Sequence, residues 1–184
     1  MSRCIEGIDM EENILKIKNT IREIPDFPKK GILFRDITTA LKDAEILKLT
    51  VDELYEQFKD EKIDYIAGIE SRGFIYGMPL AYKMNCGFIP VRKPNKLPAE
   101  TISQEYELEY GTDKIEIHKD ALKSTDRVLI VDDLLATGGT AAAAVKLISR
   151  VAKPVGIAFV IELEALKGRD KLPEDIKIVS VVKY

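Results

Sequence analysis

The densest group of residues able to do chemistry lies between positions 132 and 140. Asp132 and Asp133 follow an apolar run, and the next group is Ala136, Thr137, Gly138, Gly139 and Thr140. Glycines let a backbone approach a ligand closely. The free N–H groups at the start of a helix bind anions, helped by the helix dipole. Residues 136–140 therefore predict a site for a dianionic phosphate, to which the two threonine hydroxyls add donors.

The two carboxylates are explained by a ligand that carries hydroxyl groups close to its phosphate. Asp132 and Asp133 would repel a phosphate placed on them, but they can accept hydrogen bonds from a ribose diol and help to hold Mg2+. The segment has neither the Gly-Lys-Ser/Thr of a P-loop nor a GxGxxG pattern. An Asp pair alone is often only a loop cap, and Thr-Gly-Gly-Thr only a turn. Together, at this spacing, they indicate ribose 5-phosphate.

These residues need a sheet that brings the ends of several strands together. Apolar periodicity predicts helices at residues 13–24, 44–58, 74–84 and 140–151. It predicts strands at residues 63–69, 87–91, 127–131, 155–161 and 176–182, a loop at 132–139, and a hairpin over 101–117. Strands that alternate with helices predict an α/β, doubly wound, mainly parallel sheet with helices on both faces. Ligands of such sheets bind beyond the carboxyl ends of the strands.

Composition limits the possible classes of function. The chain has 184 residues, 46% of them hydrophobic, a net charge of −3 and a pI near 5.4. These values fit one domain and argue against a nucleic-acid partner. No apolar run approaches the roughly 20 residues that cross a bilayer, so we expect no membrane partner. Cys4 and Cys86 lack a paired spacing, which favours a reducing, cytoplasmic location.

Residues 131–140, Val-Asp-Asp-Leu-Leu-Ala-Thr-Gly-Gly-Thr, resemble the phosphoribosyl pyrophosphate signature of the type I purine phosphoribosyltransferase family. The wording is closest to that of its adenine-specific members. Segments 27–38, 68–74, 91–98, 103–111 and 162–169 resemble the same family. The resemblance implies transfer of the 5-phosphoribosyl group from phosphoribosyl pyrophosphate to adenine, giving AMP and pyrophosphate. It also implies Mg2+ as cofactor and a homodimer.

The resemblance implies a role for residues in each segment. A single domain, residues 1–184, would carry an N-terminal base-covering hood at about 10–40 and a β-hairpin flap at about 99–118. Base contacts fall on Leu33, Phe34, Arg35 and Leu163. Pyrophosphate contacts fall on Ser71, Arg72, Arg92, Lys93 and Lys96, with a cis peptide expected near Glu70–Ser71. Catalytic roles fall on Glu109, as acid or base near purine N7, and on Tyr110, which closes over the pyrophosphate.

Several alternatives stay open at this point. Residues 32–34 could simply fill the core, and the basic cluster at 92–96 could be a solvated surface run. Without the resemblance, Glu109 cannot be distinguished from Glu105 and Glu107. The base could instead be hypoxanthine, guanine or xanthine. A phosphoribosyl pyrophosphate-sensing regulator is disfavoured, because the chain has no spare length for a DNA-binding module and no basic helix.

Overall fold

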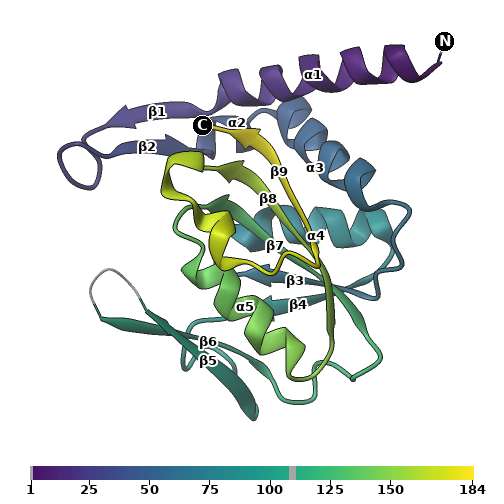
Figure 1. Cartoon of the computed structure of the whole chain (residues 1–184), viewed down its shortest axis with the longest axis vertical. Helices are drawn as coiled ribbons and strands as arrows, with labels where there is room; N and C mark the ends of the chain where they lie inside the picture. Colours follow the sequence, from purple (N-terminus) through teal and green to yellow (C-terminus); the bar gives the residue numbers. More distant parts are fainter. Residues whose placement is uncertain (1, 108–110) are drawn as a thin grey trace. The chain divides into compact units, whose positions relative to one another are not determined.

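The computed structural model describes residues 2–107 and 111–184, and the chain divides into two compact units, Met1–Glu53 and Leu54–Tyr184 (Figure 1). The elements that begin in the first unit are α1 (Ser2–Thr20), β1 (Arg22–Pro25), β2 (Leu33–Asp36), α2 (Thr38–Leu41) and α3 (Ala44–Phe58). Strands β1 and β2 form an antiparallel hairpin. The predicted hood, residues 10–40, falls within this unit.

The prediction of a helix over residues 13–24 was wrong at its end. Helix α1 stops at Thr20, and residues 22–25 form β1 instead. Arg22 pairs with Asp36 across the hairpin, and its guanidinium donates to the Asp36 carboxylate at 3.1 and 2.5 Å. The partner strand lies about ten residues further along the chain, so helical periodicity carries no signal of this pairing.

One parallel sheet forms the centre of the second unit, with the strand order β4-β3-β7-β8-β9. Its strands are β3 (Tyr65–Ile69), β4 (Gly87–Val91), β7 (Arg127–Leu135), β8 (Lys153–Glu162) and β9 (Lys177–Lys183). Helix α4 (Arg72–Met84) joins β3 to β4, and α5 (Gly139–Ser149) joins β7 to β8. The short helices η1 (Glu164–Leu166) and η2 (Gly168–Lys171) follow β8. The predicted mainly parallel α/β sheet with flanking helices is confirmed.

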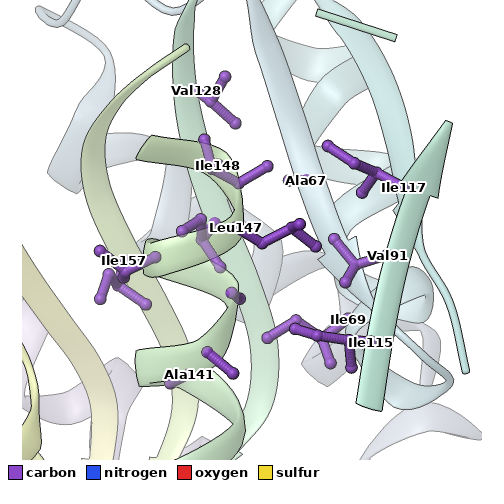
Figure 2. Packing of buried hydrophobic residues seen from close by; sticks show 14 of the residues in the cluster. Ala67, Ile69, Val91, Ile115, Ile117, Val128, Ala141, Leu147, Ile148 and Ile157 are labelled. Carbon is purple, nitrogen blue, oxygen red and sulfur yellow. The ribbon is translucent and has the colours of Figure 1, made fainter. Parts of the chain in front are cut away.

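The core of this unit lies between the sheet and α5. Alternate strand residues, such as Ala67 and Ile69, point toward α5, where Leu147 and Ile148 are fully buried (Figure 2). Each fully buried Leu or Ile side chain stabilises the fold by about 1.5–3 kcal/mol. The intervening strand residues face the opposite side, where α4 packs against β3 and β7. The carboxyl ends of β3 and β7 are therefore held rigidly.

The hairpin of β5 (Thr101–Glu107) and β6 (Thr112–His118) packs on this core, where β5 contacts α5 and β6 contacts β4. Ile115 and Ile117 of β6 are fully buried beside Val91 (Figure 2). The strands predicted between residues 101 and 117 are thus confirmed as a hairpin. Within the described residues, no helix is both long and apolar enough to span a bilayer.

Candidate active site at the carboxyl ends of the strands

Strand β7 continues through the two aspartates, which the sequence had placed in a loop. Asp132 pairs with Phe159 of β8, and Leu135 pairs with Glu162. The prediction of a loop over residues 132–139 was therefore wrong for its first half, because β8 continues alongside and its backbone pairs with that of β7. The turn is reduced to residues 136–138, directly before α5.

A small cavity lies over this turn and the start of α5. It measures about 80 Å³ and is lined by Asp132 and by residues 134–141. Gly138, the N-cap of α5, makes no side-chain capping bond to the first amide groups of the helix. Amide groups at a helix start attract anions. The five predicted phosphate-binding residues are thus brought together around one cavity.

Close contact with a second backbone segment holds the turn in place. Gly138 has φ of +77°, and a Cβ there would lie 2.1 Å from the carbonyl oxygen of Gly168. A Cβ on Gly168 would in turn lie 2.1 Å from the carbonyl oxygen of Ala136. The two segments therefore touch backbone to backbone. Sequence reasoning assigned no role to Gly168, because the contact joins residues thirty positions apart.

The two aspartates differ in their surroundings. Asp133 is 3% exposed, and its carboxylate pairs with Arg72 Nε at 2.9 Å. Asp132 lines the small cavity, and its Oδ1 accepts a hydrogen bond from the Asp133 amide at 2.9 Å. Burial raises the pKa of Asp132 well above its ordinary value, and the adjacent Asp133 carboxylate raises it further. Burial also raises the pKa of Asp133, against the opposing effect of Arg72. Burial thus makes ionisation of both carboxyl groups less favourable than in water.

The junction of β3 and α4 lies beside the aspartates. The Glu70–Ser71 peptide is cis, which confirms the expectation for this loop. Gly73 permits the close approach, because a Cβ there would lie 2.5 Å from the carbonyl oxygen of Val131. Arg72 thereby reaches Asp133. Ser71 is the N-cap of α4 and makes no side-chain capping bond to that helix.

A larger cavity joins this junction to the segment after β4. It measures about 250 Å³, and the residues that line it are Ile69, Glu70, Ser71, Arg72, Lys93, Asp132, Asp133, Leu134, Ala136 and Thr140. The cavity therefore brings predicted ribose-phosphate residues and predicted pyrophosphate residues together. Its lining combines two cations and the N-terminus of α4 with three carboxylates, which suits an anionic group that carries a metal ion.

Glu70 organises the segment after β4, a role that sequence reasoning missed. Its Oε2 accepts hydrogen bonds from Arg92 Nε and from the Lys93 amide, both at 2.8 Å. The Arg92 bond is the main reason that the pKa of Glu70 is lowered. The three predicted cations of this segment therefore differ in their surroundings. The Arg92 guanidinium bonds to Glu70, Lys93 lines the larger cavity, and Lys96 is exposed.

The flap hairpin reaches this region through Tyr106. Lys93 Nζ donates to the Tyr106 hydroxyl at 2.8 Å and forms an ion pair with Asp113. A Cβ on Gly139 would lie 3.4 Å from the Glu107 carbonyl oxygen, so β5 packs on the start of α5. The predicted catalytic residues Glu109 and Tyr110 lie outside the described residues.

The predicted base contacts come from both units. In the first unit, Leu33, Phe34 and Arg35 lie on β2. The Phe34 ring meets the Phe27 ring edge to face, with centroids 5.1 Å apart, and Arg35 forms an ion pair with Glu23. Leu33 is 42% exposed, so its side chain does not fill the core. The contact of Leu33 with a base stays a prediction.

In the second unit, Leu163 follows β8 at the same sheet edge as the aspartates. Its amide donates to the Leu135 carbonyl oxygen at 2.9 Å. A bidentate pair fastens the loop that follows: Arg169 Nε and Nη2 donate to Glu162 at 2.9 and 2.6 Å. Arg169 also donates to the Ile178 carbonyl oxygen. This pair positions Leu163 and Gly168 together.

The described residues contain no group of three or more His, Cys, Asp or Glu side chains that could hold a metal ion alone. Mg2+ commonly takes one or two protein carboxylates and completes its shell with substrate phosphates and water. Asp132 and Asp133 fit that role, because they are adjacent carboxylates that line the larger cavity together with Glu70. The residues present therefore fit a metal held mainly by its ligand.

Comparison with known proteins agrees with this geometry. Residues 38–184 match the phosphoribosyl transferase domain. The chain is similar to adenine phosphoribosyltransferase of Trichodesmium erythraeum (strain IMS101), with 58% identity over 92% of this chain and 100% of that protein. It is also similar to the crystal structure of adenine phosphoribosyltransferase from Thermoanaerobacter pseudethanolicus, with 54% identity, 93% and 99% coverage and a TM-score of 0.89.

A third similar structure contains ligands. Adenine phosphoribosyltransferase from Saccharomyces cerevisiae, complexed with an imino-altritol bisphosphate and adenine, is 41% identical, with 93% and 99% coverage and a TM-score of 0.87. Proteins that share only a fold do not show a family match together with identities and coverages this high. The chain therefore belongs to the phosphoribosyl transferase domain family, and within it to the adenine phosphoribosyltransferases.

Proposed function

We propose that this chain transfers the 5-phosphoribosyl group from phosphoribosyl pyrophosphate to adenine, giving AMP and pyrophosphate. The observation that carries the proposal is the sequence of features along β7. Two carboxylates lie in the last part of the strand, and three residues separate the end of the strand from the start of α5, where a cavity of about 80 Å³ lies. This order matches a ligand with hydroxyl groups at one end and a phosphate at the other.

The ribose and its 5-phosphate would be held by separate groups. Asp132 and Asp133 accept hydrogen bonds from the 2′ and 3′ hydroxyls, which favours their ionised form. The amide groups of residues 137–140 and the hydroxyls of Thr137 and Thr140 bind the phosphate.

The leaving pyrophosphate would be stabilised by Ser71, Arg72, Arg92, Lys93 and Lys96. Arg72 and Lys93 line the larger cavity, and the charge of Lys96 is near enough to help lower the pKa of Glu70. Bound Mg2+ would supply further positive charge to the pyrophosphate oxygens. These cations oppose the negative charge that develops as the bond to ribose C1 breaks.

The flap would exclude water from the site and place the acid/base residue beside the base. By the family resemblance, Glu109 handles the proton on purine N7 while N9 attacks C1, and Tyr110 closes over the pyrophosphate. The resemblance also assigns base contacts to Leu33, Phe34 and Arg35 in the first unit, where backbone groups near Leu33 would read the edge of the base. It assigns a further base contact to Leu163 in the second unit. Excluding water protects the reactive sugar from hydrolysis.

We infer that the protein acts as a homodimer in the cytoplasm. Helix α4 exposes Ile75, Met78 and Tyr82 by 39%, 52% and 90% on one face, at helical spacing. Apolar side chains gathered on one exposed face are typical of a protein–protein interface. Light scattering would give a mass of two chains, and a mass of one would contradict the dimer.

The double variant Asp132→Asn/Asp133→Asn tests the assignment. We expect it to fold and to form no AMP, because amides cannot replace two charged acceptors for the diol. The matched control is Asp120→Asn/Asp175→Asn, which removes two exposed carboxylates elsewhere. Undiminished AMP formation by the first variant would refute the ribose assignment. Competition among adenine, hypoxanthine, guanine and xanthine tests the base.

A further inference from the structure

Lys93 connects the larger cavity, which is the proposed pyrophosphate site, with the flap hairpin, which is proposed to exclude water. Its amide group donates to the Glu70 carboxylate, and Lys93 is one of the residues that line the cavity of about 250 Å³. Its ammonium group, however, is already occupied. It donates to the Tyr106 hydroxyl and forms an ion pair with Asp113, both on the flap hairpin.

The two flap residues act as one acceptor group. Tyr106 and Asp113 are direct partners across β5 and β6. The Tyr106 hydroxyl donates to Asp113 Oδ2 at 2.9 Å, and the Lys114 amide donates to Asp113 Oδ1 at 2.7 Å. The carboxylate is therefore held in place toward Lys93. Burial alone would raise the pKa of Asp113. The hydrogen bonds that it accepts, of which the bond from Lys93 has the largest effect, outweigh burial and lower the pKa.

An ammonium group has three donors and one charge. Two donors of Lys93 are committed to the flap, and the Asp113 carboxylate neutralises most of its charge. A phosphate oxygen that approached Lys93 would also meet the negative charge of Asp113. Full use of this cation by a polyanion therefore requires that Asp113 release it.

We propose that Asp113 is an internal competitor for Lys93, which holds the ammonium group through the flap in the empty enzyme and yields it to the pyrophosphoryl group on binding. The proposal rests on the proposed function, since it takes the larger cavity as the pyrophosphate site. Asp113 then acts through Lys93 as a positioning residue and couples the flap to occupancy of that site. The Tyr106 hydroxyl, which bonds to both Lys93 and Asp113, stabilises the contact between them and separates from Lys93 when that contact breaks.

The expected effect is modest, because the two side chains are 36% and 29% exposed. Exposed ion pairs contribute up to about 1 kcal/mol, which corresponds to about a fivefold change in an equilibrium constant. We expect Asp113→Asn to bind Mg2+-pyrophosphate about two- to fivefold more tightly than the wild type. Asp113→Ser should behave in the same way, and Asp113→Glu should stay close to the wild type.

The test is calorimetric titration of each variant with pyrophosphate and Mg2+, with thermal unfolding to verify the fold. The matched control is Glu100→Gln, which removes a carboxylate from the other end of the same hairpin, where Glu100 pairs with Lys119. Unchanged or weaker binding by both Asp113→Asn and Asp113→Ser would overturn the proposal. Equal tightening by Glu100→Gln would also overturn it, since the effect would then be one of overall charge.

A steady-state measurement separates this proposal from the function itself. The wild type is assayed in parallel for AMP formation from adenine and phosphoribosyl pyrophosphate. Transfer by the wild type without tighter pyrophosphate binding by the Asp113 variants would sink only the competitor role. Absence of transfer with every purine base would sink the proposed function.

Discussion

Replacement of Gly138 by alanine should displace the phosphate-binding turn. The new Cβ would lie 2.1 Å from the Gly168 carbonyl oxygen, whereas ordinary contacts begin at 3.4 Å. The difference of 1.3 Å (3.4 − 2.1) must be absorbed by two backbone segments, because neither contact atom belongs to a flexible side chain. A positive φ of +77° adds about 1–2 kcal/mol of strain for a residue with a Cβ.

The expected magnitude follows from this displacement. A shift of about 1 Å in a positioned group can reduce activity about 100-fold. We therefore expect Gly138→Ala to reduce kcat/KM by about 100-fold, or about 2.8 kcal/mol, and to weaken binding of ribose 5-phosphate. The strain alone should lower Tm by roughly 2–8 °C, at about 2–4 °C per kcal/mol for a chain of this size. Calorimetric titration and thermal unfolding measure the two effects separately.

Two further variants isolate the cause. Gly168→Ala creates the same overlap from the other side, with 2.1 Å to the Ala136 carbonyl oxygen, at a φ outside the left-handed region. Gly168→Ala should weaken binding of ribose 5-phosphate without the backbone strain that a positive φ adds. Gly31→Ala has φ of +88° but meets no atom within 4 Å, so it should lower Tm and leave ribose 5-phosphate binding intact. Normal binding by Gly138→Ala, or equal loss in Gly31→Ala, would refute the reasoning.

Three other outcomes follow from the site. Because the folded pKa values of Asp132 and Asp133 are raised, the ligand-free protein should lose stability as pH rises from the ordinary aspartate pKa through the raised values. Asp132→Asn should reduce that loss in Tm measured against pH, and an unchanged slope would contradict it. Glu162→Gln should lower Tm by breaking the bidentate pair with Arg169, an effect that shrinks as pH falls through the lowered pKa of Glu162; a pH-independent loss would argue against an ionic cause. Glu109→Ala should greatly reduce turnover while phosphoribosyl pyrophosphate binding stays near normal, and unchanged kinetics would remove Glu109 from the mechanism.

Local patterns predicted some elements to the residue and missed others. The amphipathic stretch at 44–58 and the apolar run at 87–91 have the same bounds in the structure. Both are defined by the spacing of their own side chains. Strands β1 and β7 were misjudged because their pairing partners, β2 and β8, lie elsewhere in the chain. Pairing, rather than local periodicity, decides where such strands begin and end.

The sequence by itself determined which chemistry could be present. Residue types at 132–140 were enough to indicate a sugar phosphate, because glycines, a helix start and adjacent carboxylates act through local geometry. The structure places Asp132 and residues 134–140 around one cavity, and Asp133 lines the larger cavity with Asp132. Roles for Glu109, Tyr110 and the base contacts rest on the family resemblance, and they stay predictions.

Only the tertiary structure decided how the charges are shared. Arg72 with Asp133, Arg92 with Glu70 and Lys93 with Asp113 are pairs that join distant segments. The contact of Gly138 with Gly168 is of the same kind. The energy of a charge depends on the groups within a few ångströms of it, and the position of a backbone segment depends on the atoms that it contacts. Those neighbours are set by how the sheet aligns its strand ends, which the order of residues along the chain does not reveal.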